Sequence, residues 1–429
     1  MRAMSHGIIE SNPIKLQRIE KEPFPSRCGS EMEKSGGEID EGLYSRQLYV
    51  FGHEAQARMQ SSDVLLVGLN GLGAEAAKNV ILSGVKSVTL HDTKNVSYTD
   101  LSANFYLSEV DIGKNRAEAC VHKMAELNQY VAVSTLKTDL SDEVLMAFGV
   151  VVLIDVDLKK QLEVAAFCHA NNIAFIAADA FGLFGSIFCD FGTDFVVHDT
   201  DGEAAATSMV TSITEDEGAI IVTTLEETRH NLETGDHVIL SDIVGLERLN
   251  DKEYRVVVTS PFSFQINPLE GQARIDISGA TYVRGGYVTQ VKQPVKITFD
   301  AMDVSQRQPG MFCSDIMKMD KAGAQHVTRQ ALHAFVASRG SFPKPGSADD
   351  AAEVYRLVCD INAGVADGDF RLDDSELEQH KGMIEDIART AAGHISPVCA
   401  LLGGVLGQEI LSEKGLAEVT AKRLLGKFG

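Results

Sequence analysis

The chain has 429 residues, enough for about two to four domains of ordinary size with ample buried core. Its formal net charge is −22, which disfavours nucleic acid and anionic membranes as partners. No apolar run reaches the ~18 residues of a membrane span, and the N-terminus lacks the apolar core of a signal peptide. Seven scattered cysteines without a CxxC pair predict free thiols, no structural zinc and a cytoplasmic and nuclear location.

Residues 1–42 are polar and lack periodicity, which predicts a disordered tail. From Leu43 onward, strands and helices alternate at a spacing typical of a mostly parallel sheet with helices on both faces. This α/β part is expected over residues 43–190. The expected strands are Asp63–Val67, Ser87–His91, Val131–Thr138, Val150–Ile154 and Ala174–Ala178, and the expected helices include Ala74–Leu82, Asn115–Asn128 and Lys160–Asn171.

Residues 191–295 have a different pattern. Short runs rich in Val, Ile and Tyr are separated by Gly, Asp and Asn, which predicts a small β-barrel. The expected strands are Asp194–His198, Ala219–Leu225, His237–Ile243, Tyr254–Thr259, Phe262–Ile266 and Tyr282–Val291. The barrel would interrupt the α/β domain as an insertion.

Residues 296–381 are predicted to form a helical bundle, because apolar residues recur at helical spacing in His326–Arg339 and again after the capping residue Ser347. The last part, 382–429, is expected to return to the α/β domain. It carries a long helix over Gly382–Glu413, broken at Pro397, whose glycines suit close packing on a sheet or a second subunit.

The clearest chemical motif follows the first predicted strand. Val67-Gly68-Leu69-Asn70-Gly71-Leu72-Gly73 is a glycine turn between a strand and a helix, where Rossmann-like proteins bind phosphates with backbone N–H groups. Asn70 stands where a glycine normally lets the backbone approach the phosphates, and its side chain would crowd a nucleotide. Asp92, after the next strand, could hold the ribose of a dinucleotide, so an NAD enzyme is an alternative that Asn70 opposes.

Three further motifs accompany this order of parts: Tyr44-Ser45-Arg46-Gln47-Leu48-Tyr49-Val50, Asp111-Ile112-Gly113-Lys114-Asn115-Arg116-Ala117 and Gly403-Gly404-Val405-Leu406-Gly407-Gln408-Glu409. Together they resemble the N-terminal half of the eukaryotic ubiquitin-activating enzymes, over about residues 41–411. The resemblance implies a ThiF/MoeB-type α/β fold that holds an inactive adenylation repeat, with the barrel as the first catalytic-cysteine half-domain and the bundle as a four-helix bundle.

Against an active repeat of that family, four positions have changed. Three belong to the degenerate nucleotide loop, formed by Gly68, Asn70, Gly71 and Gly73 together with Asp92, Lys94 and Ala103, and the fourth is Ile154. Asn70 replaces a glycine, and Lys94 replaces the acid that holds the ribose. Ala103 replaces an arginine, and Ile154 aligns with the metal-binding aspartate. The resemblance therefore implies no ATP turnover within this chain. The nearby Asp155 and Asp157 are either catalytic carboxylates or solvent-facing loop residues.

Arg46 is the one residue through which the resemblance implies retained chemistry. In the family, the arginine of this motif reaches the ATP phosphates of the active repeat in trans, and a guanidinium suits that role as a fixed fork of donors. The alternative is an exposed helix arginine paired with a nearby glutamate. No catalytic residue and no metal ligand are expected in this chain.

The function implied is the non-catalytic half of a ubiquitin-activating enzyme. The whole enzyme would use ATP and Mg, bound mainly by the other half, to adenylate ubiquitin and transfer it to a cysteine. The expected partners are ubiquitin, the active adenylation half and, through the complete enzyme, ubiquitin-conjugating enzymes. The sequence stops at Gly429 without a second intact glycine loop, which predicts either a truncated sequence or a separate subunit. The alternative is the regulatory subunit of a heterodimeric activating enzyme for another ubiquitin-like protein.

Overall fold

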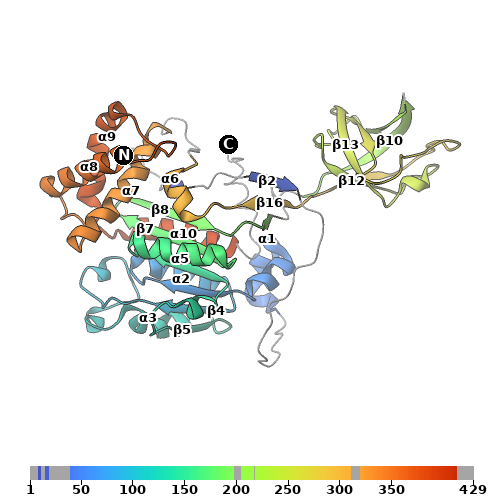
Figure 1. Cartoon of the computed structure of the whole chain (residues 1–429). Helices are drawn as coiled ribbons and strands as arrows, with labels where there is room; N and C mark the ends of the chain where they lie inside the picture. Colours follow the sequence, from blue (N-terminus) through green and yellow to red (C-terminus); the bar gives the residue numbers. More distant parts are fainter. Residues whose placement is uncertain are drawn as a thin grey trace. The chain divides into compact units, whose positions relative to one another are not determined.

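A computed structural model of the chain describes residues 8–10, 15–18, 39–197, 204–216, 218–310 and 319–412. Most of the predicted tail lies outside these residues; within it, β1 (Ile8–Glu10) and β2 (Lys15–Arg18) are strands. The chain divides into two compact units (Figure 1). The first comprises residues 1–195 and 296–429, and the second comprises residues 196–295.

The first unit is built on a seven-stranded sheet in the order β1-β8-β7-β6-β3-β4-β5. Neighbouring strands from β7 to β5 are parallel, whereas β8 runs antiparallel to β7. The strand bounds are Asp63–Val67 (β3), Ser87–His91 (β4), Ala132–Thr135 (β5), Val150–Ile154 (β6), Ala174–Phe181 (β7) and Phe184–Asp190 (β8). The predicted mostly parallel, Rossmann-like sheet is confirmed.

The central strands β3 and β6 are buried on both faces of this sheet, and their successive residues enter different cores. In β3, Val64 and Leu66 belong to one core, whereas Leu65 and Val67 belong to the other. This follows from the two-residue period of a strand. Helices α2 (Gly71–Leu82), α3 (Arg116–Ala125) and α10 (Ser396–Ser412) cover the first face, and α4 (Asp142–Leu145) and α5 (Leu158–Ala170) cover the second.

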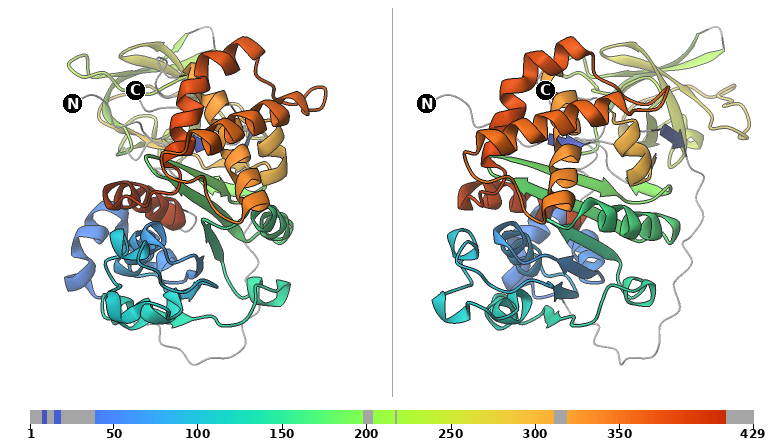
Figure 2. Two further views of the ribbon diagram at one scale, coloured as in Figure 1. Left: turned by 90° about the vertical axis from the view of Figure 1, so that its left-hand side faces the viewer. Right: turned by 60° about the vertical axis from the view of Figure 1, so that its left-hand side comes forward.

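The small residues of α10 allow it to lie directly against α2. A Cβ on Gly403 would lie 2.5 Å from the Cβ of Glu75, and one on Gly407 would lie 3.0 Å from the Cβ of Asn79. The Asn79 Nδ2 donates a hydrogen bond of 2.9 Å to the Gly403 carbonyl. Figure 2 shows α10 in dark red beside the blue and cyan N-terminal segments. The close packing predicted from the glycines therefore occurs, but these glycines lie against the helix α2 rather than against the predicted sheet or second subunit.

A group of helices follows the barrel in sequence: α6 (Met302–Arg307), α7 (Met319–Arg339), α8 (Ala348–Ala363) and α9 (Asp374–Thr390). The last three share a core that includes Leu332, Val354 and Ile384. A buried ionic network joins α7 to the sheet. The Asp179 carboxylate of β7 lies 3.2 Å from Arg329 Nη1 and 3.1 Å from His333 Nε2.

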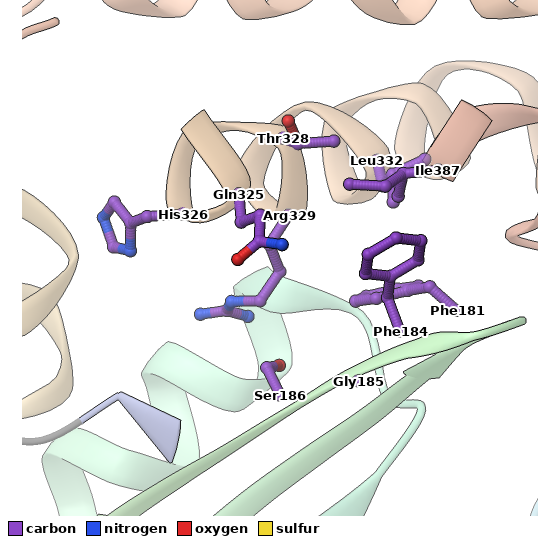
Figure 3. A pocket seen from close by; sticks show the side chains of 10 residues that line it. All are labelled: Phe181, Phe184, Gly185, Ser186, Gln325, His326, Thr328, Arg329, Leu332 and Ile387. Carbon is purple, nitrogen blue, oxygen red and sulfur yellow. The ribbon is translucent and has the colours of Figure 1, made fainter. Parts of the chain in front are cut away.

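A cavity lies beside this network, between α7, α9 and the β7–β8 hairpin. Figure 3 shows Phe181 and Phe184 facing Leu332 and Ile387, with Arg329 directed toward the sheet. Its volume is about 30 Å³. That is about the share of one water molecule in the liquid, far below the several hundred Å³ of a small-molecule site. This cavity is too small to hold a cofactor.

The second unit is a closed antiparallel barrel in the order β10-β11-β14-β13-β12-β15, which confirms the predicted inserted barrel. Its core includes Val222, Val238, Val256 and Phe264. The strands are Thr207–Asp216 (β10), Ala219–Thr224 (β11), His237–Ser241 (β12), Glu253–Ser260 (β13), Ser263–Asn267 (β14) and Tyr287–Val291 (β15).

Several predicted elements differ from the structure. The longest barrel strand, β10, was not predicted. The predicted strand Asp194–His198 corresponds to β9 (Phe195–Val197), which lies outside the barrel in a small sheet of order β2-β16-β9, where β16 is Val295–Thr298. The predicted long helix over Gly382–Glu413 is two helices. Residues 382–390 belong to α9, and Pro397 lies in the first turn of α10 rather than at a break.

No helix in the described part of the chain is long and apolar enough to span a membrane.

Candidate functional site

The degenerate nucleotide loop joins β3 to α2, and two of its glycines are required by close backbone contacts. Gly68 has a φ of +98°, and a Cβ there would lie 2.3 Å from the Ile154 carbonyl oxygen. A Cβ on Gly73 would lie 1.9 Å from the Gly68 carbonyl oxygen. These glycines let the strand, the turn and the helix pack together, which is a structural requirement independent of any ligand.

Asn70 is the N-cap of α2. Its Oδ1 accepts a hydrogen bond of 3.0 Å from the Gly73 N–H, which would otherwise be one of the unpaired donors at the start of a helix. Its Nδ2 donates to the Asp155 carboxylate. The side chain that the sequence predicted to crowd a nucleotide therefore binds two groups of the chain itself, and one of them is a backbone donor of the kind that would face a phosphate.

Ala103 and α10 cover the first residue of the helix. A Cβ on Gly71 would lie 2.4 Å from the Ala103 Cβ and 3.1 Å from the Cys399 Sγ. Ala103 is 4% exposed and Cys399 is 1% exposed. Even a methyl group has no room beside Gly71. Sequence reasoning did not identify Cys399, although its place in the small-residue segment that packs on α2 was a usable signal.

Asp92 is also fully engaged within the chain. Its Oδ2 accepts a hydrogen bond of 2.7 Å from the Leu69 N–H, and its Oδ1 accepts one of 2.8 Å from the Lys94 N–H. The Arg116 Nη1 lies 3.7 Å from the same carboxylate, while the Arg116 Nη2 lies 2.8 Å from Asp100. These contacts stabilise the turn from within and oppose the ribose-binding role of the NAD alternative. The Lys94 side chain is exposed.

Asn104 and Arg116 complete the support of the loop. The Asn104 Nδ2 donates a hydrogen bond of 2.9 Å to the Leu69 carbonyl, and Asn104 is fully buried. Arg116 lies in a motif that carried the family resemblance and Asn104 directly follows Ala103, yet sequence reasoning gave neither residue a role. Their position next to Ala103 and after Asn115 was the available signal.

Asp155 and Asp157 have different surroundings. Asp157 is exposed and caps α5, with its Oδ1 accepting a hydrogen bond of 2.9 Å from the Lys160 N–H. Asp155 has a φ of +49°, and its carboxylate also accepts a hydrogen bond of 2.8 Å from the Ala180 N–H. Burial and the nearby Asp179 carboxylate raise the pKa of Asp155. The two carboxylates do not form a catalytic pair with shared geometry.

The residues at this loop do not fit ATP. Asn70 holds the helix N-terminus, Ala103 fills the space beside Gly71, and Asp92 is bound to the backbone. Ile154, the position aligned with the family's metal-binding aspartate, is 2% exposed and apolar. Among the described residues, no three His, Cys, Asp or Glu side chains gather in a group that could hold a metal ion.

Arg46 lies in different surroundings, on α1 (Glu41–Met59). Its side chain is exposed, and in the part of the chain that the structure describes no ion pair joins it to another side chain. Leu43, Tyr49 and Val50 on the same helix are 56%, 91% and 63% exposed. The site residues thus form two groups: a closed loop at the start of α2 and an exposed arginine on α1.

Comparisons with known proteins show which family the chain resembles. The model of the ThiF family matches residues 44–413. Ubiquitin-like modifier-activating enzyme 1 of Oryctolagus cuniculus is 42% identical over 391 residues, which are 90% of this chain and 36% of that protein. Ubiquitin-activating enzyme E1 1 of Schizosaccharomyces pombe is 46% identical over 375 residues, which are 87% of this chain and 35% of that protein.

The chain spans about a third of the length of these curated relatives. Among solved structures, E. coli MccB is 21% identical, with a TM-score of 0.30 over 33% of this chain and 45% of its own. The family match covers most of the chain, from the α1 helix to the end of α10, and it agrees with the observed Rossmann-like sheet. The chain therefore belongs to the ThiF family.

Proposed function

We propose that this chain is the N-terminal, non-catalytic half of a ubiquitin-activating enzyme. It would pair with an active adenylation repeat, which binds ATP and Mg, activates the C-terminus of ubiquitin and passes it to a cysteine as a thioester. Its own contribution would be the paired α/β domain, Arg46 in trans, and part of the surface that ubiquitin contacts. The names of the relatives support the reaction, and the geometry of α1 supports the division of labour.

The observation that carries this proposal is the outward face of α1. Leu43, Arg46 and Val50 recur at three and four residues, so they share one face of the helix, and Tyr49 lies beside Arg46. Large apolar side chains that surround an exposed guanidinium are unusual on a free surface and typical of a face that another protein covers. A repeat that covers this face would receive the guanidinium directly.

A guanidinium suits the proposed role for chemical reasons. It is always charged, and its planar fork can donate two parallel hydrogen bonds to phosphate oxygens. In adenylation the phosphates of ATP are the site of developing charge, where a fixed donor is most effective. Arg46 would therefore orient and stabilise the phosphates held by the other repeat.

The barrel is the proposed first catalytic-cysteine half-domain, and it would supply the ubiquitin-facing surface of this chain. Residues 196–295 contain 16 acidic and seven basic side chains. This excess of negative charge suits a basic partner surface such as that of ubiquitin, and it would raise the association rate more than the final affinity.

Substitution of Arg46 tests the proposal. In a full-length enzyme in which this chain replaces the corresponding part of the Schizosaccharomyces pombe relative, Arg46→Ala should slow ubiquitin adenylation. Loss of one charge-assisted contact should cost on the order of 1.5–3 kcal/mol, roughly ten- to a hundredfold in rate or affinity. Arg46→Lys should recover only part of the rate, because an ammonium lacks the fork. The readout is ubiquitin-dependent pyrophosphate exchange at varied ATP.

Arg356→Ala is the matched control, because Arg356 is an exposed arginine on α8, far from α1 in sequence. An ATP KM and exchange rate unchanged by Arg46→Ala would contradict the proposal. The isolated chain should show no ubiquitin-dependent exchange. A pull-down with purified ubiquitin-like proteins would separate ubiquitin from the modifiers of the alternative, heterodimeric enzymes.

A further inference from the structure

The helix that carries Arg46 is not continuous. Gly52 has φ 78° and ψ 171°, which lie outside the helical region, and nothing lies within 4 Å of a Cβ built there. Beyond the break, Gln56 and Met59 are fully buried and attach the second segment to the core. The first segment, residues 41–51, is called the arm below. Helical continuity cannot fix its direction, because the helical hydrogen bonds are interrupted at Gly52.

Tyr44 attaches the arm to the α/β core. It is 3% exposed, and its ring lies so close to Gly84 that a Cβ there would be 2.5 Å from the Tyr44 hydroxyl. The Asn128 Nδ2 donates hydrogen bonds of 2.9 Å to this hydroxyl and 3.1 Å to the Ile81 carbonyl. The Asn128 Oδ1 accepts one of 3.1 Å from the Tyr130 N–H. A single buried amide therefore joins the arm to the end of α2.

A second contact holds the start of the arm. The Asp40 Oδ1 caps α1 by accepting a hydrogen bond of 3.0 Å from the Leu43 N–H. Its Oδ2 accepts one of 3.0 Å from the Tyr130 hydroxyl. Asp40, Tyr44, Asn128 and Tyr130 are linked in a ring of side-chain and backbone contacts, which is called the clamp below.

We propose that Asn128, acting through the clamp, is a positioning residue that sets the direction of the arm and thereby the place to which Arg46 is delivered. This inference rests on the role of Arg46 in the proposed function. Asn128 touches neither Arg46 nor any phosphate, so it is not itself a catalytic residue.

The position of Arg46 is sensitive to the direction of the arm, because a helical segment separates this residue from the break at Gly52. Arg46 is six residues from Gly52, about 9 Å along a helix. A pivot of about 10° at Gly52 would move the arginine by about 1.5 Å, and misplacements of about 1 Å can cost up to a hundredfold in rate. Without the clamp the arm would sample such orientations. Only a fraction of the molecules would then hold Arg46 where it can contact the phosphates.

The first test uses this chain alone and does not depend on ATP. Hydrogen exchange of the peptide that covers residues 41–51 is compared in wild type, Asn128→Ala and Tyr44→Phe. Asn128→Ala should speed exchange in the arm about tenfold or more, since opening of a segment sets its exchange rate. Tyr44→Phe removes only the hydroxyl and should give a smaller increase. Exchange in residues 53–59 should stay as in wild type.

Asn362→Ala is the control for general loss of stability. Asn362 is also buried, at 1% exposure, and its amide bridges the Leu372 carbonyl and N–H at 2.9 Å each, but it lies in the helical bundle. It should leave exchange in the arm unchanged. An equal increase in the arm from Asn362→Ala and Asn128→Ala, or no increase from Asn128→Ala, would overturn the clamp.

The second test uses the full-length chimeric enzyme. Asn128→Ala should lower kcat/KM for ATP in pyrophosphate exchange about tenfold, and adding it to Arg46→Ala should cause little further loss. Additive losses would show that Asn128 acts only through stability and would overturn the inference. If Arg46→Ala itself has no effect on pyrophosphate exchange, the proposed function fails. The hydrogen-exchange experiment still decides whether the clamp holds the arm.

Discussion

The start of α2 and the outward face of α1 lie in one α/β domain but treat their polar groups in opposite ways. At α2, the backbone groups that a Rossmann-like fold offers to a ligand are bound by Asn70 and Asp92 of the same chain, and Ala103 fills the space beside them. On α1, a guanidinium and three large apolar side chains are left exposed. The contrast shows that internal partners can satisfy the donors at this turn, so that the architecture does not depend on a bound ligand. Contact with another molecule is expected where polar groups lack such internal partners among the described residues, as on the exposed face of α1.

The largest expected difference between the two regions comes from one substitution made in each. Gly68 and Gly52 both have positive φ, so alanine strains either backbone by about 1–3 kcal/mol. At Gly68 the new Cβ would also lie 2.3 Å from the Ile154 carbonyl, whereas at Gly52 it meets nothing. Gly68→Ala should therefore cost about 4–5 kcal/mol or prevent folding. Chemical denaturation measures the free energy of unfolding of both variants. Equal decreases in this free energy would show that the closed loop is not tightly packed.

A smaller effect is expected from substitution of Asn70. This residue stands at a glycine position of the sequence motif, and in the structure it is the N-cap of α2. Loss of an N-cap costs about 1 kcal/mol. Asn70→Ala also removes the hydrogen bond to the Asp155 carboxylate, so the total should reach about 2–3 kcal/mol. Ser347→Ala removes a cap of the same kind, in which the Ser347 Oγ lies 3.2 Å from the Asp350 N. It should cost only the ~1 kcal/mol of the N-cap. Equal unfolding free energies for the two variants would contradict the role of Asp155.

The smallest effects concern pH, and they should have opposite signs in the two regions. Burial and Asp179 raise the pKa of Asp155 above its ordinary 3.8, so the native state loses stability as pH rises from about that value through the native pKa. The free energy of unfolding of the Asp155→Asn variant should therefore increase relative to that of wild type as pH rises. The Leu43 N–H and the Tyr130 hydroxyl lower the pKa of Asp40.

Asp40 thus contributes stability above its ordinary 3.8, and this contribution is lost as pH falls through the native pKa. Asp40→Asn should be less stable than wild type near neutral pH and approach it in acid. Melting temperatures measured from pH 3 to pH 7 give both differences. Parallel curves for the two variants would remove the electrostatic distinction between loop and arm.

Continuous apolar runs made the central strands predictable to the residue. Asp63–Val67 and Val150–Ile154 agree because strands covered on both faces are apolar almost throughout, whereas Ser87–His91 agrees because Val88 and Leu90 alternate with polar residues. Strand β10 was missed because only Val210 and Ile213 are buried in a run of threonines, serines and acids. Pro397 was interpreted as a helix breaker, yet proline is well suited to the first turn of a helix, where its missing N–H costs nothing.

The site was only partly predictable. The changed positions of the loop follow from a motif, because a glycine replaced by asparagine can be seen in the sequence. Their new partners cannot, since Asn70 and Asp155 are 85 residues apart and meet only through the order of the strands. The same holds for Tyr44 and Asn128, which are 84 residues apart. Sequence patterns indicate which positions differ from a ligand-binding motif, but only the three-dimensional contacts show which groups these positions bind.

The contact between α2 and α10 has a consequence for how this protein is made. Asn79 and Gly403 are joined by a hydrogen bond although they are 324 residues apart in the chain. At about 5–20 residues per second, roughly 16 to 65 s separate the synthesis of the two residues. Throughout that time the barrel and the bundle helices are synthesised while the small-residue side of α2 lacks its cover. The nascent chain therefore exposes this surface of α2 until α10 has been made, so the α/β core begins to form before the barrel and the bundle helices and is completed after them.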